Sequence, residues 1–344
     1  MVIPPVRWVG SPVRAVRSPV RWVGGAAPAG LPGVRELVRI GMGRVFGPPS
    51  FDPTADPGDP GLFGVGAASW RIIGEPAAIV GGIRALLVQL LHPHAMAGVA
   101  DHSRFRTDPL GRLRHTSAYV TTTAFGSTAQ ALEAARVVRR VHGFVRGTAP
   151  DGRSYRADDP HLLAWVSLAL TSSFLAADRA YAPQPADRSA ADAFVAEQSR
   201  AGALLDPRVD LDAVAGDPAA LGALRAGGLP LPLLDEGVLP LTVAGLTDRL
   251  RAFRPELGLN HQGREAWRFL CWPPLAHPVR AAYLPMLTGA LATLEPWQRR
   301  LLGLPGARLA AWPLQTNTRA LLAAFRLSTG VSPALEAARR RAAA

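Results

Sequence analysis

Apolar residues recur at helical spacing along almost the whole chain after residue 63, and this pattern limits the fold more than any other feature. Runs of period 3.6 cover residues 75–92, 109–124, 128–146, 160–181, 188–205, 242–253, 263–271, 279–303 and 317–326. No stretch shows convincing strand alternation. Residues 206–241 are broken by proline and glycine, which indicates an irregular connection with short helices. We therefore predict an all-α, single-domain fold.

Local signals mark where several of these helices begin and end. Asp108-Pro109 and Asp159-Pro160 each place an acidic N-cap before a proline at the first helical position. Ser127 and Gln130 have the spacing of a capping box. The helix that opens at Ser127 is expected to stop at Gly147.

The first residues form an imperfect seven-residue repeat, PVRWVGS, PVRAVRS, PVRWVG, whose regular prolines exclude a continuous coiled coil. Seven arginines and one glutamate give residues 1–45 a net charge of +6, half of the +12 of the chain. A basic, tryptophan-bearing arm of this kind could contact an anionic membrane surface. The alternatives are a disordered extension or a true start at Met42. We divide the chain into a disordered extension and linker (1–55), a helical domain (56–330) and a C-terminal tail (331–344).

Composition excludes several classes of protein. All 38 basic residues are arginine, so mechanisms that use a lysine base or Schiff base are excluded. The remaining charge is spread thinly, without a zinc-finger spacing, and does not indicate nucleic-acid binding. The longest uncharged apolar run, Leu162 to Ala177, is shorter than the roughly 20 residues that span a bilayer, so we predict a buried helix and no transmembrane segment. Cys271 is the single cysteine, which fits a cytoplasmic protein.

One histidine falls on the apolar side of a predicted helix. Ala131, Ala135, Val138 and His142 share a stripe, whereas Arg136, Arg139 and Arg140 lie on other faces. Such a histidine is either a core residue hydrogen-bonded to a carbonyl or an axial ligand to a flat apolar cofactor, which Gly143 would allow to approach closely.

The preceding predicted helix carries Arg112, His115, Thr116 and Tyr119 on one polar face. This face could be solvated. Alternatively, Arg112 with Thr116 could hold a carboxylate, because a guanidinium offers two parallel donors.

Three of the eight histidines, His92, His94 and His102, lie within eleven positions. The spacing of His92 and His94 directs them to different sides of a helix, and Pro93 argues against a helix there. We therefore predict that they do not share a metal ion. The segment is expected to end one helix at His92-Pro93 and then turn toward the Arg112 helix, with Ala95, Gly98 and Val99 near a cofactor.

Three segments together resemble the haem-containing oxygenases that include the rubber oxygenases (latex-clearing proteins) and mpaB. They are LLHPHAMAGVADHSRFRTDPLGRLRHTSAY, VHGFVRGTAPDGRSYRADDPHLLAWV and FLCWPPLAHPVRAAYLPML, which contain DP-x-GR-x-x-x-T, H-x-x-V-x-G and G-x-x-Y-x-A-x-DP. The resemblance covers roughly residues 60–305.

The resemblance implies a globin-like all-α fold that binds haem b. It implies that His142 is the proximal ligand of the iron and that Arg112 and Thr116 lie beside the haem. In such a site, His115 and Tyr119 could donate hydrogen bonds to bound oxygen, and His115 with Thr116 would shape the oxygen pocket. Three positions depart from the family pattern: His115 replaces a lysine, Ser167 replaces a histidine, and Asp101 is the nearest acid where rubber oxygenases have a glutamate.

These inferences favour a haem-b-dependent oxygenase that uses O2 on a hydrophobic substrate, with an isoprenoid as one candidate. Arg112, His115 and Thr116 would be its catalytic residues, and His142, Arg112, Thr116 and Tyr119 would bind the cofactor. Two alternatives stay open: a haem-binding or sensor protein without oxygenase turnover, and a helical domain without a cofactor. The sequence assigns no oligomeric state.

Overall fold

The computed structural model describes residues 50–103, 109–275, 277–305, 311–330 and 332–344, and 68% of it is helical. The predicted N-terminal extension lies almost wholly outside these residues. In chain order the elements are α2 (Ala68–Gly74), α3 (Ala77–Gln89), α4 (Pro93–His102), α5 (Pro109–Phe125), α6 (Thr128–His142), β1 (Arg146–Thr148), β2 (Ser154–Arg156), α7 (Pro160–Tyr181), α8 (Arg188–Ala203), α9 (Leu211–Gly216), α10 (Pro218–Ala226), α11 (Pro232–Asp235), α12 (Val243–Phe253), η1 (Arg254–Glu256), α13 (His261–Cys271), α14 (His277–Ala292), α15 (Pro296–Leu301), α16 (Ala311–Thr329) and α17 (Pro333–Ala343). The all-α prediction is confirmed.

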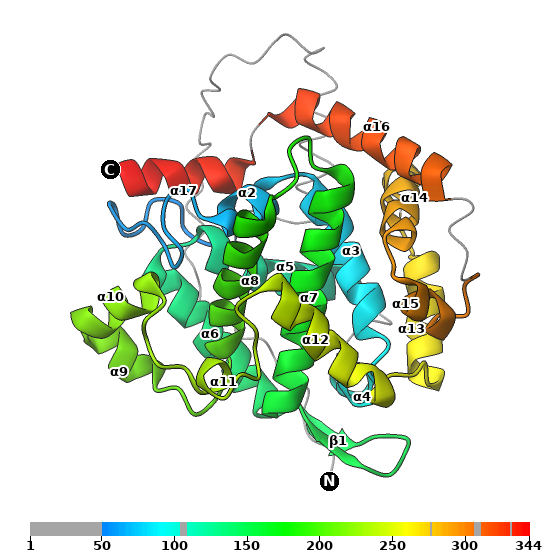
Figure 1. The fold of residues 1–344 in the computed structure, drawn as a ribbon, viewed down its shortest axis with the longest axis horizontal. Coiled ribbons are helices and arrows are strands. Elements are labelled where there is room, and N and C mark those ends of the chain that lie inside the picture. The colour runs from blue at the N-terminus through cyan, green and yellow to red at the C-terminus, as the bar shows by residue number, and fades with distance from the viewer. Residues whose placement is uncertain (1–49, 104–108, 276, 306–310, 331) are drawn as a thin grey trace.

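Helix α7 lies at the centre of the bundle and contacts α3, α8, α12 and α16 (Figure 1). It is long and apolar enough to cross a membrane, but 67% of its most apolar window is buried inside the protein. The predicted buried helix is therefore the core of the domain. Gly81 of α3 allows the close approach of α7, because a Cβ there would lie 2.8 Å from Cδ1 of Phe174.

Several predicted helix ends are confirmed. Asp159 caps α7 by accepting the His161 backbone N–H, and Ser127 and Gln130 form the capping box of α6. Asp108 lies outside the described residues. The broken stretch 206–241 contains the short helices α9, α10 and α11, as its proline pattern indicated.

Three local expectations were wrong. Pro93 does not prevent a helix but begins α4, because proline is tolerated at the first helical position, and His92 caps this helix where a turn was expected. Helix α6 ends at His142 rather than at Gly147. Gly147 instead lies in β1 under the Tyr155 ring of β2, where a Cβ would fall 2.6 Å from the Tyr155 hydroxyl oxygen.

The segment separated as a tail contains α17, which packs against α2 and α5. Its Arg341 is 3% exposed and donates to the carbonyl oxygens of Phe125 and Gly126, at the connection between α5 and α6. A buried guanidinium that satisfies these carbonyls fixes the α5–α6 turn from the far end of the chain.

Candidate functional site

His142 is the last residue of α6, at the end of the helix that faces away from the capping box. The stripe predicted from the sequence is present: Ala131 and Ala135 are buried, and Val138 and His142 are half-buried. The ring nitrogen Nδ1 of His142 is buried and has no hydrogen-bond partner in the described part of the chain. Among the described residues, this nitrogen therefore lacks the carbonyl partner that an ordinary core histidine would have.

The surroundings of His142 favour the neutral imidazole. Burial lowers the pKa of His142, and the nearby carboxylate of Asp158 opposes this effect only in part. Because an unperturbed histidine titrates near pH 6.5, the lowered pKa leaves the ring uncharged at neutral pH. A neutral imidazole with a free nitrogen is the form that coordinates a metal ion.

Helix α5 packs against α6, and a two-residue connection, Gly126-Ser127, joins them. Arg112 and His142 are each about fifteen residues from this connection, so the hairpin brings both to its open end. The side chains of Arg112 and His115 lie outside the described residues. The half-buried Thr116 lies one turn nearer the connection.

The Tyr119 hydroxyl has a partner of its own. It donates a hydrogen bond of 2.7 Å to the carbonyl oxygen of Ala201 in α8, and burial raises its pKa. This hydrogen bond attaches α5 to α8, so the proton of Tyr119 is not available to a ligand without breaking it.

Asp101, the nearest acid in the segment where rubber oxygenases have a glutamate, is also engaged. Its carboxylate accepts a hydrogen bond of 2.6 Å from the Tyr155 hydroxyl of β2 and a longer one from Gln262 of α13. These hydrogen bonds join α4 to the β1–β2 hairpin and to α13. Asp101 therefore has a structural role.

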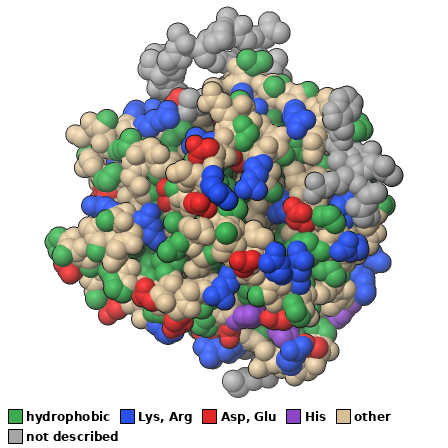
Figure 2. Space-filling model, in the orientation of Figure 1, with side chains coloured by type: hydrophobic (Ala, Val, Ile, Leu, Met, Phe, Trp, Pro, Cys, Tyr) green, Lys and Arg blue, Asp and Glu red, His purple; other side chains and the backbone are tan. Residues whose placement is uncertain are grey.

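His94 and His102 have different partners. His94 Nε2 lies 2.9 Å from an oxygen of Asp151, and His102 Nε2 lies 3.2 Å from the carbonyl oxygen of Arg146. Gly98 faces Val145 and Tyr155 of the hairpin region. Figure 2 shows histidine and acidic side chains close together along the lower edge of the molecule, near the α4 and β1 labels of Figure 1.

Sequence reasoning missed a second histidine site. His92 meets His161 from the start of α7 and Glu256 from η1, and the potential ligand atoms of all three lie within 4.8 Å of one another. These residues are far apart in the sequence and belong to no common motif. The Asp159-Pro160 signal predicted that His161 lies at the start of a helix. Nothing in the sequence indicated that it would lie next to His92 and Glu256.

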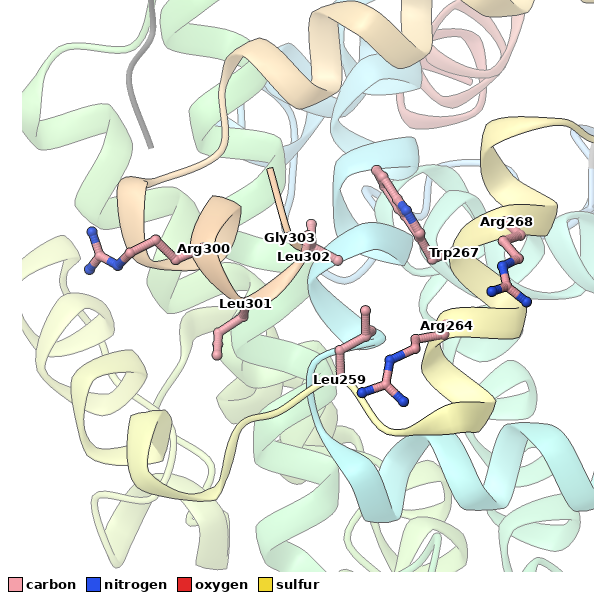
Figure 3. A pocket seen from close by; sticks show the side chains of 8 residues that line it. All are labelled: Leu259, Arg264, Trp267, Arg268, Arg300, Leu301, Leu302 and Gly303. Carbon is pink, nitrogen blue, oxygen red and sulfur yellow. The ribbon is translucent and has the colours of Figure 1, made fainter. Parts of the chain in front are cut away.

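Two surface pockets are lined by none of the predicted site residues. The first, of about 410 Å³, is lined by Leu259, Arg264, Trp267, Arg268 and residues 300–303. Arg264 projects from α13 toward Leu259, whereas Arg300 points away (Figure 3). The second, of about 520 Å³, lies beside the outward arginines of α6, where Arg136 pairs with Asp212.

Comparison with known proteins identifies the family. Residues 70–327, three quarters of the chain, match the family described as "ER-bound oxygenase mpaB/B'/Rubber oxygenase, catalytic domain". No curated protein and no solved structure matches the chain. The match includes α5, α6 and the histidine positions described above, and the chain therefore belongs to the mpaB and rubber oxygenase catalytic-domain family.

Proposed function

We propose that this domain is a haem-b-dependent oxygenase that uses O2 on a hydrophobic substrate, with His142 as the ligand of the iron. The observation that carries the proposal is the buried, unpartnered Nδ1 of a neutral histidine at the open end of the α5–α6 hairpin. Membership of an oxygenase family supports the type of reaction.

Haem suits a site with a single histidine. The macrocycle brings four nitrogen donors of its own, so the protein has to supply only one axial ligand. His142 has a nitrogen to spare, and its ring is held neutral by burial.

The roles of the other residues follow from their chemistry. Arg112, at the same end of the hairpin as His142, is suited to pair with a haem propionate, and the Thr116 hydroxyl can add a hydrogen bond. His115 can donate a proton or a hydrogen bond on the oxygen side. Bound haem would supply the redox capacity for reaction with O2, and the chain would position the hydrophobic substrate.

A second candidate is haem binding without oxygenase turnover. Asp101 favours it, because both of its carboxylate oxygens are hydrogen-bonded within the fold and neither is placed as a free base. Replacement of the family lysine by His115 points the same way.

The absorption spectrum of the purified full-length protein, together with its iron content, tests the proposal. We expect a Soret band that His142→Ala abolishes and that the control His161→Ala keeps. A full Soret band in His142→Ala would overturn the ligand assignment. Oxygen uptake with an isoprenoid hydrocarbon would support turnover, a Soret band without uptake would support the second candidate, and protein without iron or a Soret band would support a cofactor-free domain.

A further inference from the structure

We propose that His92, His161 and Glu256 form a binding site for a divalent transition-metal ion of the Zn²⁺ type, separate from His142. Three protein segments contribute: the N-cap of α4, the first turn of α7 and the end of η1. Two imidazole nitrogens and one carboxylate oxygen are a donor set that Zn²⁺ accepts, and the same set leaves a coordination position open.

The distances suit an ion. Oε2 of Glu256 lies 2.8 Å from Nε2 of His161 and 3.7 Å from Nε2 of His92. Ligand atoms about 2.0–2.1 Å from a tetrahedral Zn²⁺ are about 3.3 Å apart, which lies between these two separations. The ligand atoms of His92 and His161 lie within 4.8 Å of each other, so movement of these side chains toward a common centre would bring the three atoms to coordination distance.

The burial of His92 distinguishes this cluster from a surface ion pair. His92 is 1% exposed, and its Nε2, which is directed toward Glu256, has no hydrogen-bond partner among the described residues. A hydrogen bond between His161 and Glu256 explains their own contact but leaves this buried nitrogen unsatisfied. A metal ion would satisfy it.

Aromatic side chains hold the two rings in place. His161 stacks on Phe253 with ring centroids 4.4 Å apart, and His92 lies against Trp165 at 5.6 Å and Phe253 at 6.1 Å. Rings restrained in this way lose little freedom when they coordinate an ion, which lowers the entropic cost of binding.

Coordination requires one change at His92. Its Nδ1 now accepts the Ala95 backbone N–H at 3.5 Å, so the ring proton is on Nε2. Coordination at Nε2 moves this proton to Nδ1, which can then no longer accept the hydrogen bond from the Ala95 backbone N–H. A hydrogen bond of this length is weak, so its loss costs little compared with the gain of a metal–nitrogen bond.

The outer side of the site is open. The side chains of His161 and Glu256 are 53% and 43% exposed, whereas His92 forms the buried floor. A bound ion would thus keep at least one position for water or a small ligand, as catalytic zinc sites do and closed structural sites do not.

Titration of the chelator-treated, full-length protein with Zn²⁺, followed by calorimetry, tests the proposal. We expect one site that His161→Ala and Glu256→Gln each weaken by more than about 100-fold, the upper size for loss of a supporting residue. Glu256→Gln keeps the shape of an exposed side chain and should not unfold the protein. Co²⁺ provides a second readout, because its visible absorption reports nitrogen and oxygen coordination.

The controls separate this site from other histidines and from the haem proposal. His94→Ala, which removes the neighbouring histidine, and His142→Ala should bind Zn²⁺ as the wild type does. Bound Zn²⁺ should raise the thermal midpoint of the wild type but not that of His161→Ala, because an ion that binds only the folded state stabilises it. Equal Zn²⁺ affinity in wild type, His161→Ala and Glu256→Gln would overturn the proposal, whatever the spectrum of the haem.

Discussion

The two histidine regions of this domain differ in how many protein donors they bring together. At the end of α6, His142 presents one unpartnered nitrogen. Near α4, His92, His161 and Glu256 present three donor atoms within 4.8 Å. A lone donor suits a cofactor that carries its own ligands, whereas converging donors suit a bare ion.

The regions also differ in their packing. His92 lies in the core against Trp165, which is fully buried. Two residues after His142, Phe144 is 64% exposed. The first region is thus built into the bundle around α7, and the second lies next to an exposed aromatic side chain at the end of α6.

The largest expected difference between the two regions comes from the variant His142→Gly. Without the imidazole, the iron loses its protein ligand, so we expect the Soret band of the isolated protein to disappear and Zn²⁺ binding to stay unchanged. Added imidazole can occupy the space left by the side chain and should restore the Soret band. The absorption spectrum with and without imidazole measures this, and a full Soret band in its absence would show that another residue holds the iron.

The second largest effect is expected on stability, when Trp165 beside His92 and Phe144 near His142 are each replaced by alanine. Trp165→Ala should lower the free energy of unfolding by about 3–5 kcal/mol, toward the lower end because the variant also removes a buried Nε1–H without a partner. Phe144→Ala should change it by less than about 0.5 kcal/mol, since the ring is exposed. Urea denaturation compares the two variants, and similar losses in both would contradict the difference in packing.

Much of the fold was predictable from the sequence because the helices are specified locally. The apolar stripes and caps of α6 and α7 act within one helix, so periodicity found both. The β1–β2 hairpin was missed because strands of three residues are too short to show an alternation of apolar and polar side chains. Helix α4 was missed because Pro93 was taken to oppose a helix that it in fact begins.

The same limit applies to the sites. The half-buried position of His142 was predictable because it follows from the apolar stripe of its own helix. The cluster of His92, His161 and Glu256 was not, because it depends on the packing of α4, α7 and η1, which no local pattern encodes. Arg341 is a similar case: its partners at the α5–α6 connection are more than 200 residues away in the sequence.

The smallest expected effect comes from His94→Ala, which tests whether the cluster is defined by space or by sequence. His94 is two residues from His92, yet its ring pairs with Asp151, at the tip of the β1–β2 hairpin. The hydrogen bond from His94, followed by one from the Arg153 backbone, lowers the pKa of Asp151 to about 2. Without His94, that pKa should rise toward 3.8 but stay below it, because the Arg153 bond remains.

The sign of this effect sets its pH range. A lowered carboxyl pKa contributes stability above the pKa of the unfolded chain, and that contribution is lost as the pH falls through the folded value. His94→Ala should therefore move the acid limb of the Asp151 titration upward, which NMR can follow. At neutral pH, where this contribution is fully present in the wild type, the free energy of unfolding of His94→Ala should fall slightly. The Soret band and the Zn²⁺ affinity should match those of the wild type. Loss of Zn²⁺ affinity in this variant would mean that proximity in the sequence, through His94, matters more to the site than the three-segment geometry around His92.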